Sequence, residues 1–336
     1  MSKSIVIKGG TVINRSSQEV ADVKIENDCV VEVGKNLRGD IQLDASGCIV
    51  SSGFVDLHAH LREPGKEEAE TIETGSRAGA LGGYTALVAM PNTDPPQDSV
   101  AVIDFVREQG KRAGLVHVVP SGCITLGRQG ESLAPMAELA NAGVTLFTDD
   151  GNGVQDVALM RRALEYAKGL GITLAQHCEV AELTKGAVMN ECSCCTDLGL
   201  PGWPSIAEEL MVFRDIELVR ITGASMHFLH LSTMRSVELV RAAKRDGLAI
   251  TAEVTPHHLS LTQELLSSYN PVFKVNPPLR SIEDIRALKA GLLDGTIDAI
   301  ATDHAPHTLA EKQQSYSQAP SGGPLVQHAL PALLEM

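Results

Sequence analysis

The pattern of apolar and polar positions changes once along this chain, near residue 50. From Gly53 onward, compact apolar runs alternate with amphipathic stretches rich in Ala, Glu, Arg and Leu, which is typical of repeated βα units. The apolar runs predict eight strands: Gly53–His58, Thr85–Met90, Val116–Ser121, Val144–Asp149, Thr173–His177, Ser225–His230, Ala249–Thr255 and Ala299–Asp303. The amphipathic stretches predict helices, several of them ended by a glycine: Glu70–Leu81, Ser99–Ala113, Met136–Ala142, Val157–Gly169, Ile206–Thr222, Met234–Asp246 and Ile282–Asp294.

Residues 1–50 carry a different pattern, in which short alternating segments are separated by Gly, Asn and Asp turns. The pattern predicts a small β domain over 1–50 and a second domain over 51–336. Its predicted strands are Ser4–Lys8, Ala21–Ile25, Val30–Val33 and Cys48–Val50.

Eight βα units predict an α/β fold, a (β/α)₈ barrel of the TIM type, preceded by the small β-sandwich-like domain. The eighth helical pattern begins near Pro324 and is still apolar at Met336. We therefore expect a chain that is truncated in its last helix and lacks the C-terminal strands of the small domain. In such barrels the chemistry lies at the C-terminal ends of the strands. Polar residues fall there in this chain: His58, His60, Asn92, Asp149, Asp150, His177, His230 and Asp303.

Composition and charge narrow the classes of partner. The 336 residues are 43% hydrophobic and 21% charged, a globular composition that supports a large core. The formal net charge of −14 argues against nucleic acid or an anionic membrane as a partner, because both would be repelled. The sequence has no apolar secretory segment at its start and no apolar run of spanning length. We expect a cytoplasmic protein.

The seven cysteines are scattered through a large chain, and this odd number predicts no disulfide framework. Cys192, Cys194 and Cys195 form a denser cluster, for which a soft-metal site or a redox loop is the alternative interpretation. No second cysteine pair lies at the spacing of a zinc site. The preferred interpretation is an incidental loop.

The first predicted strand of the second domain leads into His58-Ala59-His60. In extended backbone, residues i and i+2 share a face, so the two imidazoles can bind one metal ion while Ala59 faces the other way. Paired histidines in strands also occur as hydrogen-bonded core residues, which is the alternative interpretation.

Four histidines and two carboxylates at the ends of five predicted strands favour the metal site over that alternative. Imidazoles and carboxylates are the donors that a pair of divalent ions needs. Two such ions can share a hydroxide, lower the pKa of its parent water and polarise a carbonyl. The pattern therefore predicts a hydrolase site.

Six long motifs resemble those of class I dihydroorotases of the amidohydrolase superfamily. The resemblance runs from about residue 4 to residue 336, and the motifs are Gly53–Gly65, Met90–Thr93, Phe147–Gly151, Glu253–His258, Lys274–Arg280 and Ala301–His307.

The resemblance implies two Zn²⁺ ions per subunit, for which manganese or cobalt could substitute. One ion is held by His58, His60 and Asp303. The other is held by His177 and His230, and Asp150 bridges the two; its choice over Asp149 follows from motif position. The fourth strand has no lysine at its end, whereas a carboxylated lysine bridges the metals in many cyclic-amide hydrolases. This difference counts against a hydantoinase or an allantoinase.

The implied substrates are dihydroorotate and N-carbamoyl aspartate, small anions with planar amides. Arg62 lies two residues after His60, on the same face, where its guanidinium can bind a carboxylate through two hydrogen bonds. The motifs imply amide contacts from Asn92 and Asn276. A loop salt bridge for Arg62, and turn caps beside proline for the two asparagines, are the surface alternatives.

His307 is implied as a further donor to the carboxylate. After the eighth strand the sequence departs from the usual family text over Ser321–His328. Within this segment, Gly322 and Gly323 can offer backbone N–H groups to the substrate.

We therefore expect a dihydroorotase, which reversibly hydrolyses the cyclic amide of (S)-dihydroorotate to N-carbamoyl-L-aspartate in de novo pyrimidine (UMP) biosynthesis. A metal-bridged hydroxide would attack the ring carbonyl, with Asp303 as general acid/base. One alternative is another cyclic-amide hydrolase, allantoinase-like or hydantoinase-like. The other is a catalytically silent dihydroorotase-like scaffold. A homodimer is expected, and aspartate transcarbamoylase is the partner that the resemblance suggests.

Overall fold

The computed structural model describes residues 3–14 and 16–336, and the chain divides into two compact units between Phe54 and Val55. Each unit is described by itself. In the described part of the chain, no helix combines the length and the apolar character needed to cross a membrane.

The N-terminal unit is one five-stranded sheet with the order β3-β2-β1-β4, and β5 also pairs with β1. The two-layered, sandwich-like arrangement expected from the sequence is not present among its described residues. The strand at 41–44 was not predicted, because its four side chains are all exposed and leave no buried face; its amide at Ile41 donates to the carbonyl of Ser4. The strands are β1 (Ile5–Ile13), β2 (Gln18–Glu26), β3 (Cys29–Gly34), β4 (Ile41–Asp44) and β5 (Ile49–Val50).

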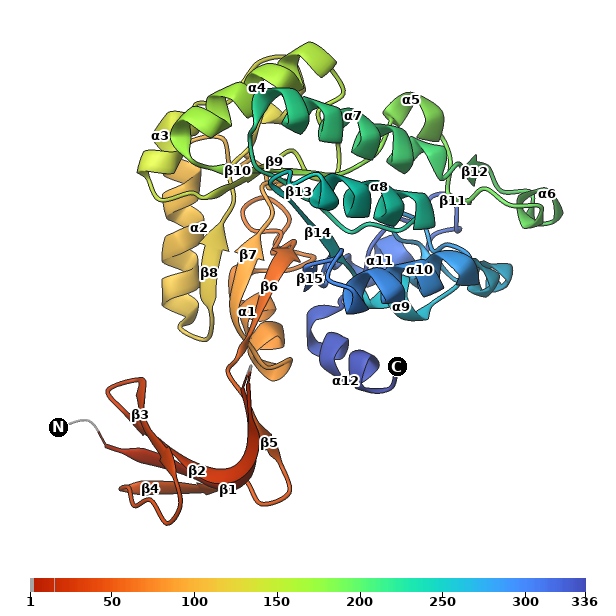
Figure 1. The fold of residues 1–336 in the computed structure, drawn as a ribbon. Helices are drawn as coiled ribbons and strands as arrows, with labels where there is room; N and C mark the ends of the chain where they lie inside the picture. The colour runs from red at the N-terminus through yellow and green to blue at the C-terminus, as the bar shows by residue number, and fades with distance from the viewer. Residues whose placement is uncertain (1–2, 15) are drawn as a thin grey trace. The chain divides into compact units, whose positions relative to one another are not determined.

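The second unit carries eight parallel strands in two sheets (Figure 1). One sheet has the order β6-β7-β8, and the other has the order β15-β14-β13-β10-β9. Single bridges, Gly122 to Phe147 and Ala59 to His304, connect the edges of the two sheets. The strands are β6 (Phe54–Ala59), β7 (Tyr84–Ala89), β8 (His117–Pro120), β9 (Leu146–Thr148), β10 (Thr173–Gln176), β13 (Met226–Phe228), β14 (Ile250–Val254) and β15 (Ala299–Ile300).

The regular ladders therefore do not form the single closed eight-stranded barrel that the sequence predicts. The strands are short because the chain leaves the extended conformation where it reaches the polar residues at their ends. His230 has φ of 31° and Asp303 has φ of 49°, in the left-handed region that a β ladder does not accommodate. β15 is reduced in this way to two residues.

The seven helices predicted from the amphipathic stretches are present, with ends within two residues of the prediction. α4 shows why the pattern was informative: Asp156 caps its first turn, and Gly171 ends it with φ of 67°. Its apolar side chains recur on one buried face. The helices are α1 (Ile72–Leu81), α2 (Val100–Ala113), α3 (Met136–Asn141), α4 (Val157–Leu170), α7 (Ile206–Thr222), α8 (Met234–Arg245) and α10 (Ile282–Leu293).

Short elements in the loops were not predicted, because they are too brief to show a period. They are α5 (Ala181–Thr184), β11 (Met189–Asn190), α6 (Cys194–Leu198), β12 (Gly202–Trp203), α9 (Pro256–Ser260), α11 (Leu309–Lys312) and the 3₁₀ turns η1 (Leu126–Arg128), η2 (Gln263–Ser268), η3 (Pro271–Phe273) and η4 (Val326–His328). α12 (Ala329–Leu334) follows η4, where the eighth helical pattern was expected.

Three apolar clusters lie in the second unit. The largest lies between strands β9–β14 and the helices around them and includes Phe147, Met160 and Phe228. A second includes Ile72 and Leu87. The third is small and lies among the loops: its buried residues are Met189, Leu266 and Tyr316, and Cys192, Cys194 and Cys195 pack against it. We call it the loop cluster.

Candidate metal centre

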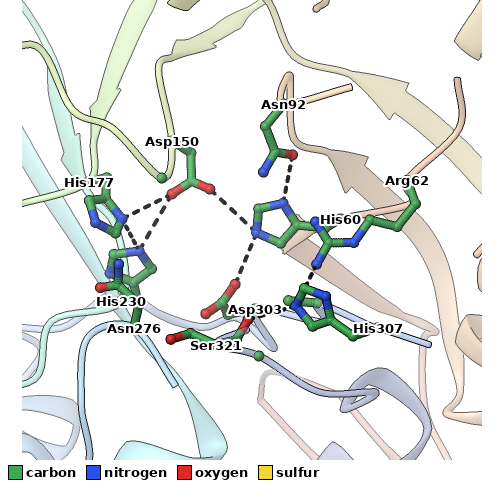
Figure 2. A pocket seen from close by; sticks show the side chains of 13 residues that line it. His60, Arg62, Asn92, Asp150, His177, His230, Asn276, Asp303, His307 and Ser321 are labelled. Atoms are coloured by element: carbon green, nitrogen blue, oxygen red, sulfur yellow. Dashed lines mark hydrogen bonds and ion pairs between the residues drawn. The ribbon is translucent and has the colours of Figure 1, made fainter. Parts of the chain in front are cut away.

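The carboxylate of Asp150 lies among four imidazoles, of which Figure 2 shows those of His60, His177 and His230. Its Oδ2 atom is 3.4 Å from the Nε2 atoms of both His58 and His60. Its Oδ1 atom is 3.4 Å from Nδ1 of His177 and 3.5 Å from Nε2 of His230. One carboxylate therefore touches two pairs of histidines, one pair with each oxygen.

Asp303 completes the first of these groups. Its Oδ1 atom is 3.1 Å from Nε2 of His60 and 3.6 Å from Nε2 of His58. The six side chains come from the C-terminal ends of β6, β9, β10, β13 and β15. The structure thus brings together all six residues that the sequence suggests as metal ligands.

The neighbouring carboxylates Asp149 and Asp150 serve different purposes. Asp149 accepts hydrogen bonds from the amides of Ile124 and Thr125, at 2.8 and 3.1 Å, and from the Thr125 hydroxyl. Burial raises the pKa of Asp149. Burial also acts to raise the pKa of Asp150, but the adjacent histidines, His58 foremost, outweigh it and hold that pKa well below its usual range. Asp149 therefore fixes a loop, and Asp150 is the ionised group that faces the histidines.

The donor atoms fit a pair of divalent metal ions. His58, His60 and Asp150 each bring one donor atom within 4.8 Å of the others, and so do Asp150, His177 and His230. Nε2 of His58 and Oδ1 of Asp150 are buried without a hydrogen-bond partner. Buried polar atoms normally have a partner, so these two unpaired atoms are suited to bind a metal ion. Imidazole and carboxylate donors suit zinc and similar ions.

A buried glutamate that the sequence did not single out as a site residue binds His58, one ring of the first histidine pair. Glu253, in β14, has no exposed surface, and its two oxygens lie 2.8 Å from Nδ1 of His58 and 3.1 Å from Nε2 of His227. Burial raises the pKa of Glu253, but hydrogen bonds from these two histidines outweigh it and lower that pKa to about 2. An ionised acceptor at Nδ1 leaves the Nε2 lone pair of His58 free for a metal. In the sequence, the feature that could have pointed to Glu253 is a single charged residue within an apolar strand.

Glu179 has the same relation to His177, one ring of the second pair. Its Oε2 atom is 2.9 Å from Nε2 of His177, so the Nδ1 atom of that ring faces Asp150. The same oxygen accepts from Nδ2 of Asn276 at 3.3 Å, and Thr184 donates to its other oxygen. Its signal was its position two residues after a strand-end histidine.

Asn92 binds His60, one of the candidate metal ligands, and also lines the cavity. Its Oδ1 atom is 2.8 Å from Nδ1 of His60. This oxygen is therefore not free for the substrate contact predicted from the sequence, and the amide nitrogen is the atom left for that purpose.

A cavity of about 170 Å³ opens in front of this centre. Arg62 lies in its wall, with φ of 62°, and its Nε–H donates to the carbonyl of Pro306 at 3.0 Å. Nη2 of Arg62 lies 3.3 Å from Nε2 of His307, which is itself 2.7 Å from the carbonyl of Ser321. Burial, followed by the charge of Arg62, lowers the pKa of His307 to about 4, so this ring is neutral near pH 7. The lining residues are His60, Arg62, Asn92, Asp150, Gly151, His177, His230, Asn276, Asp303, Ala305, His307, Ser321 and Gly322.

The two glycines expected to offer N–H groups are placed differently. Gly322 lines the cavity, but its N–H donates to the carbonyl of Lys274 at 2.8 Å and is not free. A side chain at Gly322 would lie 2.6 Å from Cβ of Ala305, and its φ is 112°, so only glycine fits there. Gly323 is not in the lining; its carbonyl accepts from the amide of Ala305. Backbone hydrogen bonds to Lys274 and Ala305 set the conformation of this segment, and the residue types alone did not reveal them.

Comparison with known proteins agrees with this geometry. Residues 47–236 match the family model described as dihydro-orotase-like. A dihydroorotase from Streptomyces coelicolor is 48% identical over 326 residues, covering 96% of this chain and 75% of the relative. A dihydroorotase from Geobacter sp. (strain M21) is 47% identical over 338 residues, covering 99% and 80%.

Solved structures show the same fold at lower identity. An L-hydantoinase (dihydropyrimidinase) from Arthrobacter aurescens superposes with a TM-score of 0.85 at 21% identity, covering 99% of this chain and 77% of that one. A D-hydantoinase from Thermus sp. superposes with a TM-score of 0.80 at 24% identity, covering 98% and 76%. At this level of identity the solved structures are evidence for the fold alone. The dihydroorotases share nearly half of their residues with this chain, and on that ground this chain belongs to the dihydroorotase family.

Proposed function

We propose that this protein is a dihydroorotase, which opens the ring amide of (S)-dihydroorotate to give N-carbamoyl-L-aspartate and also catalyses the reverse reaction in pyrimidine biosynthesis. The observation that carries the proposal is the pairing of two features in one cavity: an aspartate shared by four histidines, and a buried arginine facing them. The first feature suits amide hydrolysis and the second suits an anionic substrate.

Two divalent ions, zinc in the simplest case, would be held by His58, His60 and Asp303 on one side and by His177 and His230 on the other, with Asp150 between them. When bound, they supply an activated water and polarise the ring carbonyl. The unpaired buried atoms of His58 and Asp150 support this assignment.

Asp303 moves the proton. Burial raises its pKa, but its hydrogen bond with His60 and the charge of His58 outweigh burial and keep that pKa below its usual range. The ionised carboxylate accepts the proton of the attacking water, and the resulting acid returns it to the departing amide nitrogen. Its position after the C-terminal end of β15 supports this role, because the carboxylate faces both the histidines and the cavity (Figure 2).

Arg62 and Asn276 orient the substrate. The guanidinium of Arg62 keeps its charge and binds the carboxylate, while its Nε–H is fixed on the carbonyl of Pro306. Oδ1 of Asn276 is buried without a partner and can accept a hydrogen bond from an amide N–H of the ring. His307 and the amide nitrogen of Asn92 supply further polar contacts along the same wall.

We also propose a closed barrel, a homodimer and a cellular location for the enzyme. The eight strands follow one another in a circle when the single bridges are counted, which supports a closed (β/α)₈ barrel over residues 51–336 after a small β domain over 1–50. Half-exposed apolar side chains on α7, at Ile206, Leu210 and Phe213, support a homodimer contact. We place the enzyme in the cytoplasm. Aspartate transcarbamoylase is the candidate partner, because it would supply N-carbamoyl-L-aspartate for the reverse reaction.

The test is metal analysis of the purified chain together with ring opening of dihydroorotate, followed by the loss of ultraviolet absorbance. Allantoin and hydantoin serve as parallel substrates. Bound metal with turnover of dihydroorotate alone supports the proposal. Bound metal with turnover of only allantoin or hydantoin, or of none of the three, overturns the substrate assignment, and folded protein without metal affinity overturns the centre itself.

A further inference from the structure

Three cysteines gather in the loop between β11 and β12, away from the metal centre along the chain (Figure 1). Cys192 and Cys194 are joined by a disulfide, and Cys195 is a free thiol. The Sγ atom of Cys195 lies 3.9 Å from that of Cys192. The sequence predicted no disulfide framework; the structure has one local disulfide with a third sulfur in contact with it.

This disulfide contributes little to stability through chain entropy. That contribution grows with the length of the closed loop, and here a single residue separates the two cysteines. A bond of this kind is better suited to reaction than to bracing the fold.

A cavity gives small molecules access to two of the three cysteines. The three cysteines are half-buried, and a cavity of about 490 Å³ lies beside Cys192 and Cys194. Its other walls include polar side chains, among them Gln263 and Ser267. The thiol of Cys195 donates to the carbonyl of Asn190 at 3.1 Å and so is held next to the disulfide.

We propose that Cys192, Cys194 and Cys195 form a thiol–disulfide exchange site whose ligands are low-molecular-weight thiols and disulfides. The Cys195 thiolate attacks Sγ of Cys192, a new Cys192–Cys195 bond forms, and Cys194 leaves as a thiolate that takes up the proton lost by Cys195. No net oxidation occurs in this step. A small dithiol supplies two electrons and two protons to open either disulfide and is itself converted to a disulfide.

The state of this site is transmitted to two segments that line the catalytic cavity. The cysteines pack on the loop cluster, whose members Leu266 and Tyr316 lie in the segments that lead into Asn276 and Ser321. Opening the disulfide loosens this packing.

A hydrogen-bonded chain follows the same direction. Asn190, which accepts the Cys195 thiol at its carbonyl, uses its side chain to bind Gln263 and Nη1 of buried Arg280. Arg280 in turn donates to the hydroxyl of Ser232, two residues beyond His230. A change at Cys195 therefore reaches the segment next to His230, which lines the cavity, through a polar path as well as an apolar one.

Exchange is tested by locating the free thiol. The full chain is oxidised with glutathione disulfide, freed of it, incubated, quenched in acid, alkylated and mapped by mass spectrometry without reduction. We expect alkylation at both Cys194 and Cys195, and a Cys192–Cys195 bond in the Cys194→Ser variant. Cys48→Ser, which removes an exposed thiol of the N-terminal unit, is the matched control and should leave the map otherwise unchanged.

Two results would overturn exchange. One is alkylation confined to Cys195 after long incubation, with no Cys192–Cys195 bond in Cys194→Ser. The other is the binding of one additional zinc ion by the reduced chain that is lost in Cys194→Ser, because the loop would then be a thiolate metal site.

Transmission is tested by hydrogen–deuterium exchange, which does not depend on the proposed catalytic activity. We expect amides in 274–280 and 316–323 to exchange at least twofold faster in the reduced chain than in the oxidised chain. The difference should vanish in Cys192→Ser, while 146–150 is unchanged in both. Equal exchange in the two redox states of the wild-type chain would overturn the regulatory role.

Discussion

The cavity has two walls that are built in different ways. We call the side with the proposed metal ligands the metal wall, and the side with Arg62, Asn276 and His307 the substrate wall. On the metal wall, His58 binds the carboxylate of Glu253 and His177 binds that of Glu179. Each ring uses the nitrogen that faces away from the centre. On the substrate wall, Arg62 and His307 each bind a backbone carbonyl of the segment that follows β15, that of Pro306 and that of Ser321. The metal wall is therefore braced by carboxylates, Glu253 from another strand and Glu179 from two residues along the chain, and the substrate wall by backbone carbonyls.

The difference indicates what each wall must tolerate. Metal ligands need fixed tautomers and directions, which ionised partners in a closed core provide. A substrate wall must bind and release an anion, so its donors are anchored at one atom and leave others free. Damage to the metal wall should therefore affect the centre itself, whereas damage to the substrate wall should affect binding.

Replacing Asp303 with Asn should give the largest effect, because the residue belongs to both walls. The variant keeps the shape of the side chain but cannot accept the proton, so we expect kcat to fall by about 10³-fold in both directions. Steady-state kinetics and metal analysis measure this. Asp298→Asn is the matched control: this carboxylate precedes β15 at its other end and binds Lys244 and the amide of Ala252, so turnover should be retained. Residual activity near that of the wild type in Asp303→Asn would sink the proton-transfer role.

Replacing Glu253 with Gln should weaken the metal wall from behind. One end of the new amide is a donor and meets an N–H of His58 or His227, so one of these rings loses its acceptor and its orientation. We expect metal affinity to fall by about 10- to 100-fold, measured by competition with a chelator. Metal affinity and kcat that both match the wild type would show that the carboxylate does not orient the ligand.

The same comparison explains what the sequence could predict. His177 follows a short apolar run, and Asp303 follows another, so local pattern and the barrel rule place them at one mouth. Glu253 was not placed, because its partners lie 195 and 26 residues away and an isolated charge in a strand does not reveal them. The choice of Asp150 over Asp149 came from the family motif, and the structure gives its physical reason in the three donors that hold Asp149.

The fold shows a similar limit. Helices such as α4 could be predicted because their apolar residues recur with the helical period on one buried face. β4 and β15 could not be predicted well, because one has no buried face and the other is cut short by the backbone turn at Asp303. Where a backbone bond decides the outcome, as at Gly322, the residue type indicates only that space is limited.

Replacing Arg62 with Met tests the substrate wall directly. The variant loses a charge-assisted hydrogen bond worth about 2 kcal/mol, so we expect KM for dihydroorotate to rise roughly thirtyfold. Metal content should stay the same, because Arg62 is bound to Pro306 and His307 and to none of the proposed metal ligands. Arg62→Lys keeps the charge without the planar fork and should fall between the two. An unchanged KM together with lost metal would reverse the assignment of the two walls.

Replacing Asn276 with Ala should give the smallest effect, because this residue lies on the substrate wall but touches a brace of the metal wall. Its Nδ2 atom donates to Glu179 over 3.3 Å, while its Oδ1 atom has no partner within the protein. Losing one neutral hydrogen bond to the substrate costs about 1 kcal/mol, so KM should rise roughly fivefold with kcat nearly constant. Steady-state kinetics on both substrates measure the split. If kcat and metal affinity fall instead, the contact with Glu179 is the important one, and Asn276 belongs with the residues that orient His177.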